Sequence, residues 1–213
     1  MNLLDPKMRA LLDYAAIRQL LQSWGFWRDD EMWERLAGAY APEGVMTTGA
    51  SSGTAAQFVA FSREFAQRAN IRAQHFVGAS DVEVDGDRAL GQTRVMILLR
   101  GMLHGVEVDV TVFARFYDRL IRLAGGWRIL ERRPVYERDR IDTVAPGMQL
   151  VLDRNKLERY PEGYRHMAYL NNAAGIARTS RNLTCSGDRA ELQTLLDAGH
   201  AWLREANASA DGG

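Results

Sequence analysis

Two adjacent carboxylates, Asp29 and Asp30, lie in residues 24–40, WGFWRDDEMWERLAGAY, among three tryptophans and a phenylalanine. A carboxyl group in apolar surroundings has a raised pKa, because a low dielectric disfavours its charged form. Such a carboxyl group is a common general base. Alternatively, one aspartate only caps a helix that begins near Glu31, since aspartate oxygens accept the free N–H groups of a helix N-terminus. Both interpretations stay open, because one aspartate can cap while the other faces a cavity.

The composition excludes several classes of protein. Acidic and basic residues number 27 each, and the arginines between residues 128 and 140 are interrupted by acids, so no basic surface for nucleic acid is expected. The single cysteine, Cys185, excludes an internal disulfide, and four scattered histidines show no metal-ligand spacing. The N-terminus is typical of an amphipathic helix, and no apolar run reaches membrane-spanning length. We therefore expect a soluble, cytoplasmic protein without metal or cofactor.

The first third of the chain is expected to be mainly helical. The predicted helices cover residues 8–27, 31–39 and 54–68, with a short strand at 44–49. Asp5-Pro6 suits the start of the first helix, and Pro42 and Gly44 are expected to end the second. Thr54 is the expected cap of the third helix. Its apolar face, expected to join the core, carries Phe58, Phe61 and Phe65.

The hydrophobic period then changes to two, which predicts strands. The expected strands cover residues 75–84, 88–100, 106–121 and 127–139. Asp85-Gly86 is a strong hairpin signal, and glycine-containing turns separate the later strands. Pro134 indicates an edge or a bulge, because proline donates no ladder hydrogen bond. Helices followed by a meander predict an α+β fold, with helices packed on one face of a curved antiparallel sheet. The mouth of such a cone is a natural small-molecule site.

The chain changes character after Pro146-Gly147. Residues 1–146 are expected to form the α+β domain, and residues 147–213 a partly helical extension that packs on it or on a partner subunit. Helices are expected at residues 163–176 and 188–205, with Asp188 as the cap of the second. Residues 207–213, NASADGG, are expected to be disordered. The extension either covers the mouth of the cone with its tyrosines (Tyr160, Tyr164 and Tyr169) or extends a dimer contact.

The order of elements resembles the NTF2-like α+β cone fold, and specifically its SnoaL-like branch. That branch includes polyketide cyclases, scytalone dehydratase and hexachlorocyclohexane dehydrochlorinase. The resemblance spans roughly residues 11–143. It is carried by three segments: AIRQLLQSWGFWRDDEMWERLAGAYAPEGV, QHFVGASDVEVDGDRA and FARFYDRLIRLAGGWRILERRPVYERDRID. Because this fold hosts enzymes, ligand carriers and structural subunits, the resemblance is more specific for fold than for function.

The resemblance implies an Asp–His pair. Counting back from Leu36 places the aspartate at Asp29, and the histidine that begins a strand is His75. An arginine that assists leaving-group departure in the dehydrochlorinase corresponds to Arg132. Two positions depart from the family pattern: Trp24 replaces the dehydrochlorinase lysine, and Arg28 replaces the tyrosine beside the aspartate of scytalone dehydratase. The Asp–His pair is therefore expected without a recognised substrate partner.

These residues predict a cofactor-free lyase or isomerase of dehydratase, hydratase or cyclase type. His75 would be the general base for an apolar cyclic or aromatic substrate, and Asp29 would orient it. The candidate catalytic residues are Asp29, His75 and Arg132, and the candidate pocket residues are Trp24, Trp27, Tyr40, Arg94 and Phe113. Tyr40, Arg94 or Arg132 would bind a developing oxyanion. In the alternative interpretation, Arg132 is an ion-pair partner of Glu131 or Asp139, and Asp30 is a cap or a surface residue.

Two non-catalytic functions remain open. One is a structural subunit that resembles the β-subunit of ring-hydroxylating dioxygenases, and the other is a ligand-binding protein with the same cone. A homodimer or higher homo-oligomer is expected in each case, because a meander sheet leaves one face exposed. In residues 106–116, Val108, Val110 and Val112 take one face and Phe113 adds an apolar group to the other. His104, His166 and His200 are expected at the surface.

Overall fold

The computed structural model describes residues 5–49, 52–68, 70–175 and 183–208. In chain order its elements are α1 (Pro6–Asp29), α2 (Trp33–Gly38), β1 (Tyr40–Thr47), β2 (Ser52–Thr54), α3 (Ala55–Arg68), β3 (Ile71–Asp85), β4 (Arg88–Leu103), β5 (Val106–Leu123), β6 (Gly126–Thr143), α4 (Arg154–Leu157), α5 (Arg165–Ala173) and α6 (Arg189–Ala208). The strands of this part of the chain form one sheet in the order β2-β1-β6-β5-β4-β3. The expected α+β architecture is confirmed.

The sheet is mixed, whereas the sequence predicted an antiparallel one. Strands β3 to β6 form the expected antiparallel meander, but β1 pairs with β6 in parallel, with Met46 opposite Arg132. Parallel pairing requires a long crossover, and α3 with the meander supplies it. Bulges between Val77 and Ser80 and between Phe113 and Ala114 interrupt the ladders. Bulges of this kind bend a strand and increase its twist, so they help to give the sheet its curvature.

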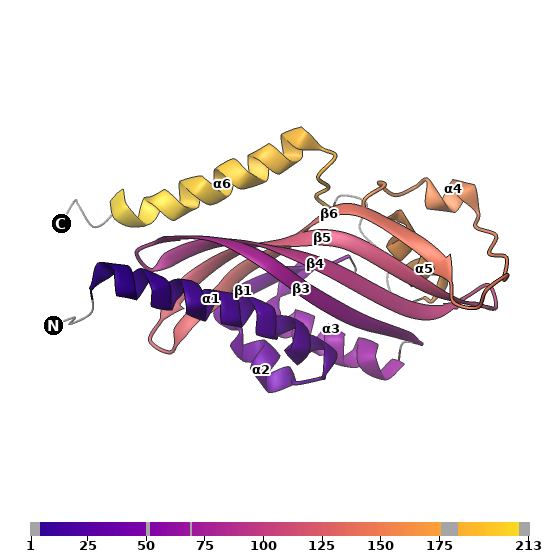
Figure 1. Cartoon of the computed structure of the whole chain (residues 1–213), viewed down its shortest axis with the longest axis horizontal. Coiled ribbons are helices and arrows are strands. Elements are labelled where there is room, and N and C mark those ends of the chain that lie inside the picture. The colour runs from indigo at the N-terminus through magenta and orange to yellow at the C-terminus, as the bar shows by residue number, and fades with distance from the viewer. Residues whose placement is uncertain (1–4, 50–51, 69, 176–182, 209–213) are drawn as a thin grey trace.

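Helices α1, α2 and α3 lie on one face of the sheet, and α6 lies along the other (Figure 1). Ile17, Leu21 and Trp24 of α1 are buried in the main core, together with the inward-facing Val108, Val110 and Val112 of β5. Helix α6 forms a smaller cluster on the opposite face, where its Leu203 packs with Leu90, Tyr117 and Val135. Part of the face expected to bind a second subunit is therefore covered by the chain's own helix.

The helix α5 lies at the far end of the sheet and packs on β4, β5 and β6 (Figure 1). Its Met167, Ala168 and Leu170 belong to the main core, as does Tyr164, which precedes the helix. The short helix α4 was not anticipated from the sequence. The division at residue 146 stays a prediction. The tail was predicted to be disordered from residue 207, which was wrong at its start because α6 continues to Ala208, and residues 209–213 lie outside the described residues.

The predicted helix caps are confirmed. Asp5 accepts a hydrogen bond from the backbone of Lys7 at 3.0 Å, with Pro6 as the first helical residue. Thr54 and Gln57 form a reciprocal capping box, in which each side chain accepts from the other's backbone N–H, at 3.2 and 2.9 Å. Asp188 accepts from the backbone of Glu191 at 3.0 Å. Short-range sequence signals of this kind depend on a few neighbouring residues, which is why they could be predicted.

Two local predictions were wrong. Helix α2 begins at Trp33 rather than Glu31, because Glu31 has a φ of +58° and therefore lies outside the helical region. Pro42 and Gly44 do not follow α2 as a loop. They lie within β1, where its pairing with β6 is irregular.

Pro134 was predicted to lie at an edge or a bulge. Strand β6 lies inside the sheet, between β1 and β5, but Pro134 falls where the pairing with β1 has ended. The parallel pairing of β1 with β6 ends at Met46 opposite Arg132, so Pro134 follows directly after β1 has ended. Beyond it, the Tyr136 N–H donates to the carbonyl oxygen of Thr184 at 2.9 Å. Pro134 thus lies in a short gap between two partners of β6, where no donor is required.

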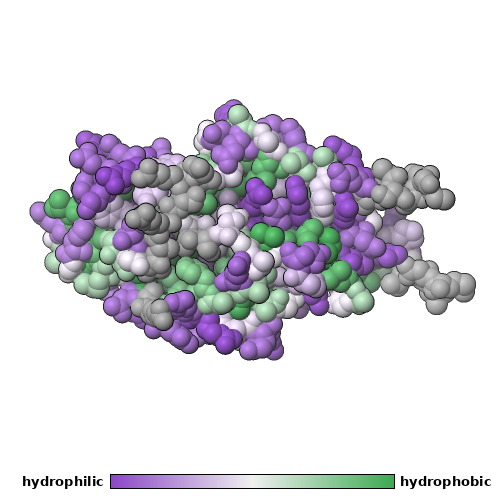
Figure 2. Space-filling view, turned by 180° about the vertical axis from the view of Figure 1, so that it is seen from behind, coloured by the Kyte–Doolittle hydropathy of each residue, from purple (hydrophilic) through white to green (hydrophobic). Residues whose placement is uncertain are grey.

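The surface seen from behind is dominated by polar residues, and its hydrophobic residues gather in small groups (Figure 2). Exposed apolar side chains include Leu11 and Phe26 of α1 and Phe76 of β3. Among the described helices, none is long and apolar enough to cross a membrane.

An ion pair fastens α1 to the hairpin between β5 and β6. Arg122 holds both carboxylate oxygens of Asp13, at 2.5 and 2.6 Å, and its guanidinium lies over the ring of Trp127. The indole N–H of Trp127 donates to the same carboxylate at 3.2 Å. The hydrogen bonds from Arg122 lower the pKa of Asp13. The pair therefore joins the start of the structure to a turn more than a hundred residues later.

This pair gives a pH-dependent contribution to stability. A carboxyl group with a lowered folded pKa stabilises the fold above its unfolded pKa of about 4, and this contribution is lost as the pH falls through the folded value. We expect Asp13→Asn to lower the free energy of unfolding by about 1 kcal/mol at neutral pH, because water reaches part of the pair. The difference from the wild type should close in acid. Urea titrations at several pH values would measure it, and a gap that is unchanged in acid would contradict the assignment.

Candidate active site

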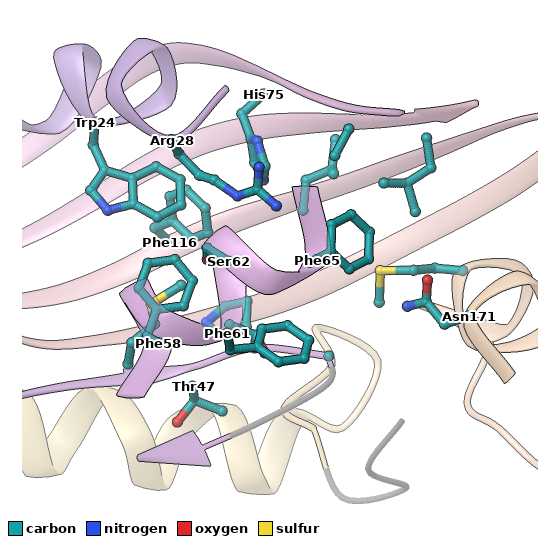
Figure 3. A pocket seen from close by; sticks show the side chains of 18 of the residues that line it. Trp24, Arg28, Thr47, Phe58, Phe61, Ser62, Phe65, His75, Phe116 and Asn171 are labelled. Atoms are coloured by element: carbon teal, nitrogen blue, oxygen red, sulfur yellow. The ribbon is translucent and has the colours of Figure 1, made fainter. Parts of the chain in front are cut away.

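A pocket opens between α1, α3, the sheet and α5, with a volume of about 110 Å³ (Figure 3). Its wall is largely aromatic, formed by Trp24, Phe58, Phe61, Phe65, Phe116 and Tyr136. Polar side chains reach it at a few points, namely Arg28, Thr47, Thr48, Ser62, His75 and Asn171. An apolar pocket with a few convergent polar groups is the usual form of a small-molecule site.

The structure brings Asp29 and His75 together at the wall of this pocket. Asp29 is the last residue of α1, and one of its carboxylate oxygens lies 2.7 Å from Nδ1 of His75. The other oxygen accepts the backbone N–H of His75 at 2.5 Å. The side chains are only 14% and 10% exposed. His75 lines the pocket and Asp29 lies behind it, so the carboxylate fixes both the backbone and the ring of the histidine.

The alternative interpretation required Asp29 or Asp30 to cap α2, and neither of them does. The N-cap residue of α2 is Met32, and no side chain caps that helix. Asp30 is exposed, and its backbone N–H closes the end of α1 on the carbonyl oxygen of Phe26. Asp29 is therefore left for the contact with His75.

Close packing of α1 on β3 sets this geometry. A Cβ atom on Gly25 would lie 2.8 Å from Cγ2 of Val77 and 3.2 Å from the carbonyl oxygen of His75. Valine has little rotameric freedom to move aside. The absence of a side chain at Gly25 thus allows the helix to approach β3 one turn before Asp29.

We expect Gly25→Ala to destabilise the protein by about 1–3 kcal/mol, because the added methyl group forces α1 away from β3. Alanine in place of a helical glycine ordinarily stabilises a helix by up to about 1 kcal/mol. The matched control is Gly38→Ala in α2, where nothing lies within 4 Å of the added methyl group. Thermal denaturation of both variants would test this expectation. A stabilised Gly25→Ala variant would contradict the close approach.

Trp24 forms the inner wall beside His75. Its ring meets the imidazole edge-on at a centroid distance of 5.5 Å and stacks on Phe58 at 5.9 Å. The indole N–H donates to the hydroxyl oxygen of Tyr40 at 2.9 Å. Burial raises the pKa of Tyr40, which lies behind Trp24 and does not line the pocket. Tyr40 therefore positions the wall, and it does not line the pocket as the sequence predicted.

Arg132 is not at the pocket surface. It is fully buried, and it forms a two-bonded ion pair with the equally buried Asp118, at 2.7 and 2.9 Å. Its guanidinium lies over the rings of both Trp24 and Phe116, 4.6 and 4.3 Å from their centroids. The predicted partners, Glu131 and Asp139, were wrong, and Arg132 does not line the pocket, as a role in leaving-group binding would require. Arg132 supports the aromatic wall from behind.

Three further predicted pocket residues lie elsewhere. Side chains alternate between the faces of a strand, and Ile97 and Leu99 of β4 point into the pocket. Arg94 therefore points to the opposite face, where it pairs with Glu137 at 3.5 Å. Phe113 is on that face too, beneath the guanidinium of Arg138. Trp27 packs against the core without lining the pocket.

The sequence interpretation missed several pocket residues. Phe58, Phe61 and Phe65 were assigned to the core; they share one face of α3 as expected, but that face lines the pocket. Helical spacing identifies such a face without showing whether side chains or a cavity oppose it. Met167 and Asn171 of α5 complete the wall, in place of the tyrosines suggested to cover the mouth. No local signal identified them.

A second Asp–His pair has the same geometry outside the pocket. Asp139 lies 2.8 Å from Nδ1 of His166 and accepts the backbone N–H groups of His166 and Met167, at 2.7 and 2.8 Å. These are first-turn donors of α5, which lacks a side-chain cap of its own. Asp139 therefore caps α5 from the neighbouring strand β6.

The remaining histidines show no comparable arrangement. His104 bonds the hydroxyl group of Tyr169 at 3.0 Å, and His200 pairs with Glu83 at 3.5 Å. Within the described residues, no group of three or more histidine, cysteine, aspartate or glutamate side chains comes together to hold a metal ion. The absence of a cofactor stays a prediction.

Comparison with known proteins places the chain in a family. Residues 9–133 match the model of the SnoaL-like domain. The chain is 30% identical over 165 residues to pea pathogenicity protein 2 of Fusarium vanettenii. The aligned residues cover 76% of this chain and 71% of that protein. It is 29% identical over 200 residues to an uncharacterised protein of Emericella nidulans, covering 91% and 83% of the two chains.

Solved structures share the fold at low identity. A type 2 hexachlorocyclohexane dehydrochlorinase superposes with a TM-score of 0.56 at 16% identity, covering 70% of this chain and 99% of the other. A Novosphingobium aromaticivorans protein provisionally assigned as a scytalone dehydratase gives 0.53 at 13% identity, with 67% and 97% covered. The chain belongs to the SnoaL-like family and has the NTF2-like cone fold.

Proposed function

We propose that this protein is a cofactor-free lyase or isomerase, of dehydratase, hydratase or cyclase type, that acts on an apolar cyclic or aromatic substrate. The observation that carries the proposal is the 2.7 Å contact between Asp29 and Nδ1 of His75 at the wall of an aromatic pocket. His75 is the general base, and Asp29 is the residue that positions it.

The geometry explains how the pair would work. The Asp29 carboxylate accepts the Nδ1–H of His75, which leaves Nε2 as the nitrogen with a free lone pair. Nε2 takes a proton from carbon or water, and Asp29 stabilises the resulting imidazolium. General base catalysis of this kind contributes about 10²–10⁴-fold to a rate. This chemistry suits elimination, hydration and isomerisation.

The pocket supports a small ring as the substrate. Its volume of about 110 Å³ is on the scale of the cavity of about 150 Å³ known to bind benzene. The pocket is open to solvent on one side, so a larger substrate extends outward from the ring. Aromatic walls bind such rings by stacked or edge-on contacts.

A generic elimination substrate tests the base before the natural substrate is known. In 5-nitrobenzisoxazole, a base removes the ring C–H proton, the C–H electron pair forms a nitrile, and the N–O bond breaks to release a coloured phenolate. We expect turnover above that of free imidazole. A parallel screen of cyclic alcohols and ketones for dehydration and isomerisation would then narrow the substrate class. The absence of all activity, with ligand still bound, would reject the proposal.

A ligand-binding protein without catalysis is the second candidate, and the burial of Arg132 favours it. The family resemblance assigned this arginine to the leaving group, yet both Arg132 and Asp118 are fully buried. Binding of ring compounds without turnover would support this function. The role of a dioxygenase-like structural subunit, the cytoplasmic location and the homo-oligomer stay predictions. Exposed Phe26 and Phe76 are candidates for a contact between subunits.

A further inference from the structure

One cationic side chain has no role in the proposal above. Arg28, the residue before Asp29, lines the pocket with His75, and both side chains point into it from α1 and β3 (Figure 3). Among the pocket-lining side chains in the described residues, Arg28 alone carries a permanent charge. The rest of the wall around it is mainly apolar.

The Arg28 guanidinium has no ion pair among the described residues. It lies over the ring of Phe65, 5.7 Å from the guanidinium carbon to the ring centroid. The neighbouring carboxylate of Asp29 uses both oxygens for the ring and the backbone of His75. Burial lowers the pKa of Arg28, although the charges of Asp29 and Glu31 oppose that change.

The Arg28 side chain is half-buried beside an open pocket, so its charge is partly removed from water, and this loss of hydration is costly unless a partner compensates it. Buried arginines normally have such a partner, and Arg132 in this protein has Asp118. Arg28 has no such partner among the described residues, and its guanidinium faces the open pocket instead. A planar guanidinium presents paired N–H donors that match a carboxylate or a phenolate oxygen, which a lysine does less well.

We propose that Arg28 is the anion-binding residue of the pocket, and that the ligand is a ring compound bearing an oxyanion, either a carboxylate or a phenolate. This inference rests on the proposed function in one respect only, namely that the pocket binds a ring compound. Bound beside His75, the oxyanion also offsets the positive charge that the imidazole gains when it takes a proton. The apolar wall holds the ring, and Arg28 sets its orientation.

Matched ligands and variants test the charge directly. Benzoate and benzamide share a shape and differ in charge, and 4-nitrophenol reports its phenolate by colour. The variants are Arg28→Met, Arg28→Lys and the control Arg138→Met. Arg138 also lies over a phenylalanine, at 4.6 Å from the centroid of Phe113, but on the opposite face of the sheet. Binding is measured by ligand-observed NMR, and circular dichroism confirms folding.

The wild type should bind benzoate more tightly than benzamide by about 10- to 100-fold, the range for hydrogen bonds to charged groups. Arg28→Met should abolish this preference and leave benzamide binding unchanged, whereas Arg28→Lys should keep part of it and Arg138→Met all of it. For 4-nitrophenol, wild-type protein should lower the apparent pKa of the bound phenol by about 1, and Arg28→Met should not. Preference for only one of the two anions identifies which oxyanion the pocket takes.

Two results would overturn the inference. Equal binding of benzoate and benzamide, together with an unshifted apparent pKa of bound 4-nitrophenol, both unaffected by Arg28→Met, would show that Arg28 does not recognise anions, and this result would leave the general base proposal intact. Failure to bind any of the ring compounds at millimolar concentration would reject the pocket as their site and the proposed function with it. Turnover of 5-nitrobenzisoxazole by the same preparation distinguishes the two results, because it is expected to persist in the first and to be absent in the second.

Discussion

Replacing His75 with alanine is expected to remove the base-catalysed turnover of 5-nitrobenzisoxazole, a loss of about 10²–10⁴-fold. The reason is that Asp29 lies behind His75, and among the described residues that line the pocket no other side chain is a general base. The protein should remain folded, because one partly buried hydrogen bond contributes only about 1 kcal/mol. Initial rates and thermal denaturation of the same sample measure both effects.

His166→Ala is the matched control for this experiment. It removes an imidazole that contacts a carboxylate at 2.8 Å, close to the 2.7 Å of the His75 pair. Asp139 keeps its bonds to the backbone N–H groups of α5, so the helix should stay in place. We expect this variant to retain full activity. If His75→Ala lost much stability yet kept its activity, His75 would be a structural residue and the catalytic assignment would fail.

The variant Asp29→Asn tests whether Asp29 orients His75 through its carboxylate or only fills space behind it. The amide group still fits, but an N–H donor in place of the carboxylate oxygen opposes the tautomer that carries hydrogen on Nδ1. Turnover should fall while stability changes little, and a normal rate in this variant would show that His75 needs no orienting carboxylate.

The parts of the fold that depend on local sequence were predictable. The caps of α1, α3 and α6 and the hairpin turn at Gly86 depend on a few neighbouring residues, and they occur where the sequence indicated. Asp29 and His75 could be paired only through the family resemblance, since they are 46 residues apart. No periodicity reports a contact between the end of a helix and a strand that distant.

The remaining wrong predictions concern which residues are paired across neighbouring strands and which face of the sheet a side chain occupies. Asp118 and Arg132 are directly opposite each other on β5 and β6, a pairing that follows from the turn at Gly126 and a bulge between Arg119 and Leu120. A one-residue bulge shifts every later pair, so the partner of Arg132 was not readable from spacing alone. Phe113 differs, because its alternation with Val112 already placed it on the face away from the core.

Removal of one member of the buried pair should have the largest effect on stability. We expect Asp118→Ala to lower the free energy of unfolding by about 3–5 kcal/mol, because it leaves the Arg132 charge without a partner in the core. Both side chains are 0% exposed, and Nη1 of Arg132 already has no hydrogen-bond partner among the described residues. Chemical denaturation at neutral pH measures the loss.

A second ion pair in the same sheet is the control. Arg100 and Asp109 form a two-bonded contact at 2.7 and 2.6 Å, as close as that of the buried pair, but their side chains are 44% and 41% exposed. Water solvates either partner when the other is removed, so Asp109→Ala should change stability far less than Asp118→Ala. Equal losses in the two variants would show that burial is not the cause.

The double replacement Asp118→Leu with Arg132→Met tests whether the ion pair itself stabilises the fold, or whether only the loss of one partner is destabilising. Apolar residues of similar volume often replace a buried ion pair without loss, since no charge then needs to be removed from water. We expect the double variant to recover most of the stability that Asp118→Ala loses. The pocket should respond differently, because Arg132 lies against Trp24 and Trp24 forms the wall beside His75. A stable double variant with weaker ring binding would show that the buried charge maintains the shape of the pocket; a double variant as unstable as Asp118→Ala would contradict this separation.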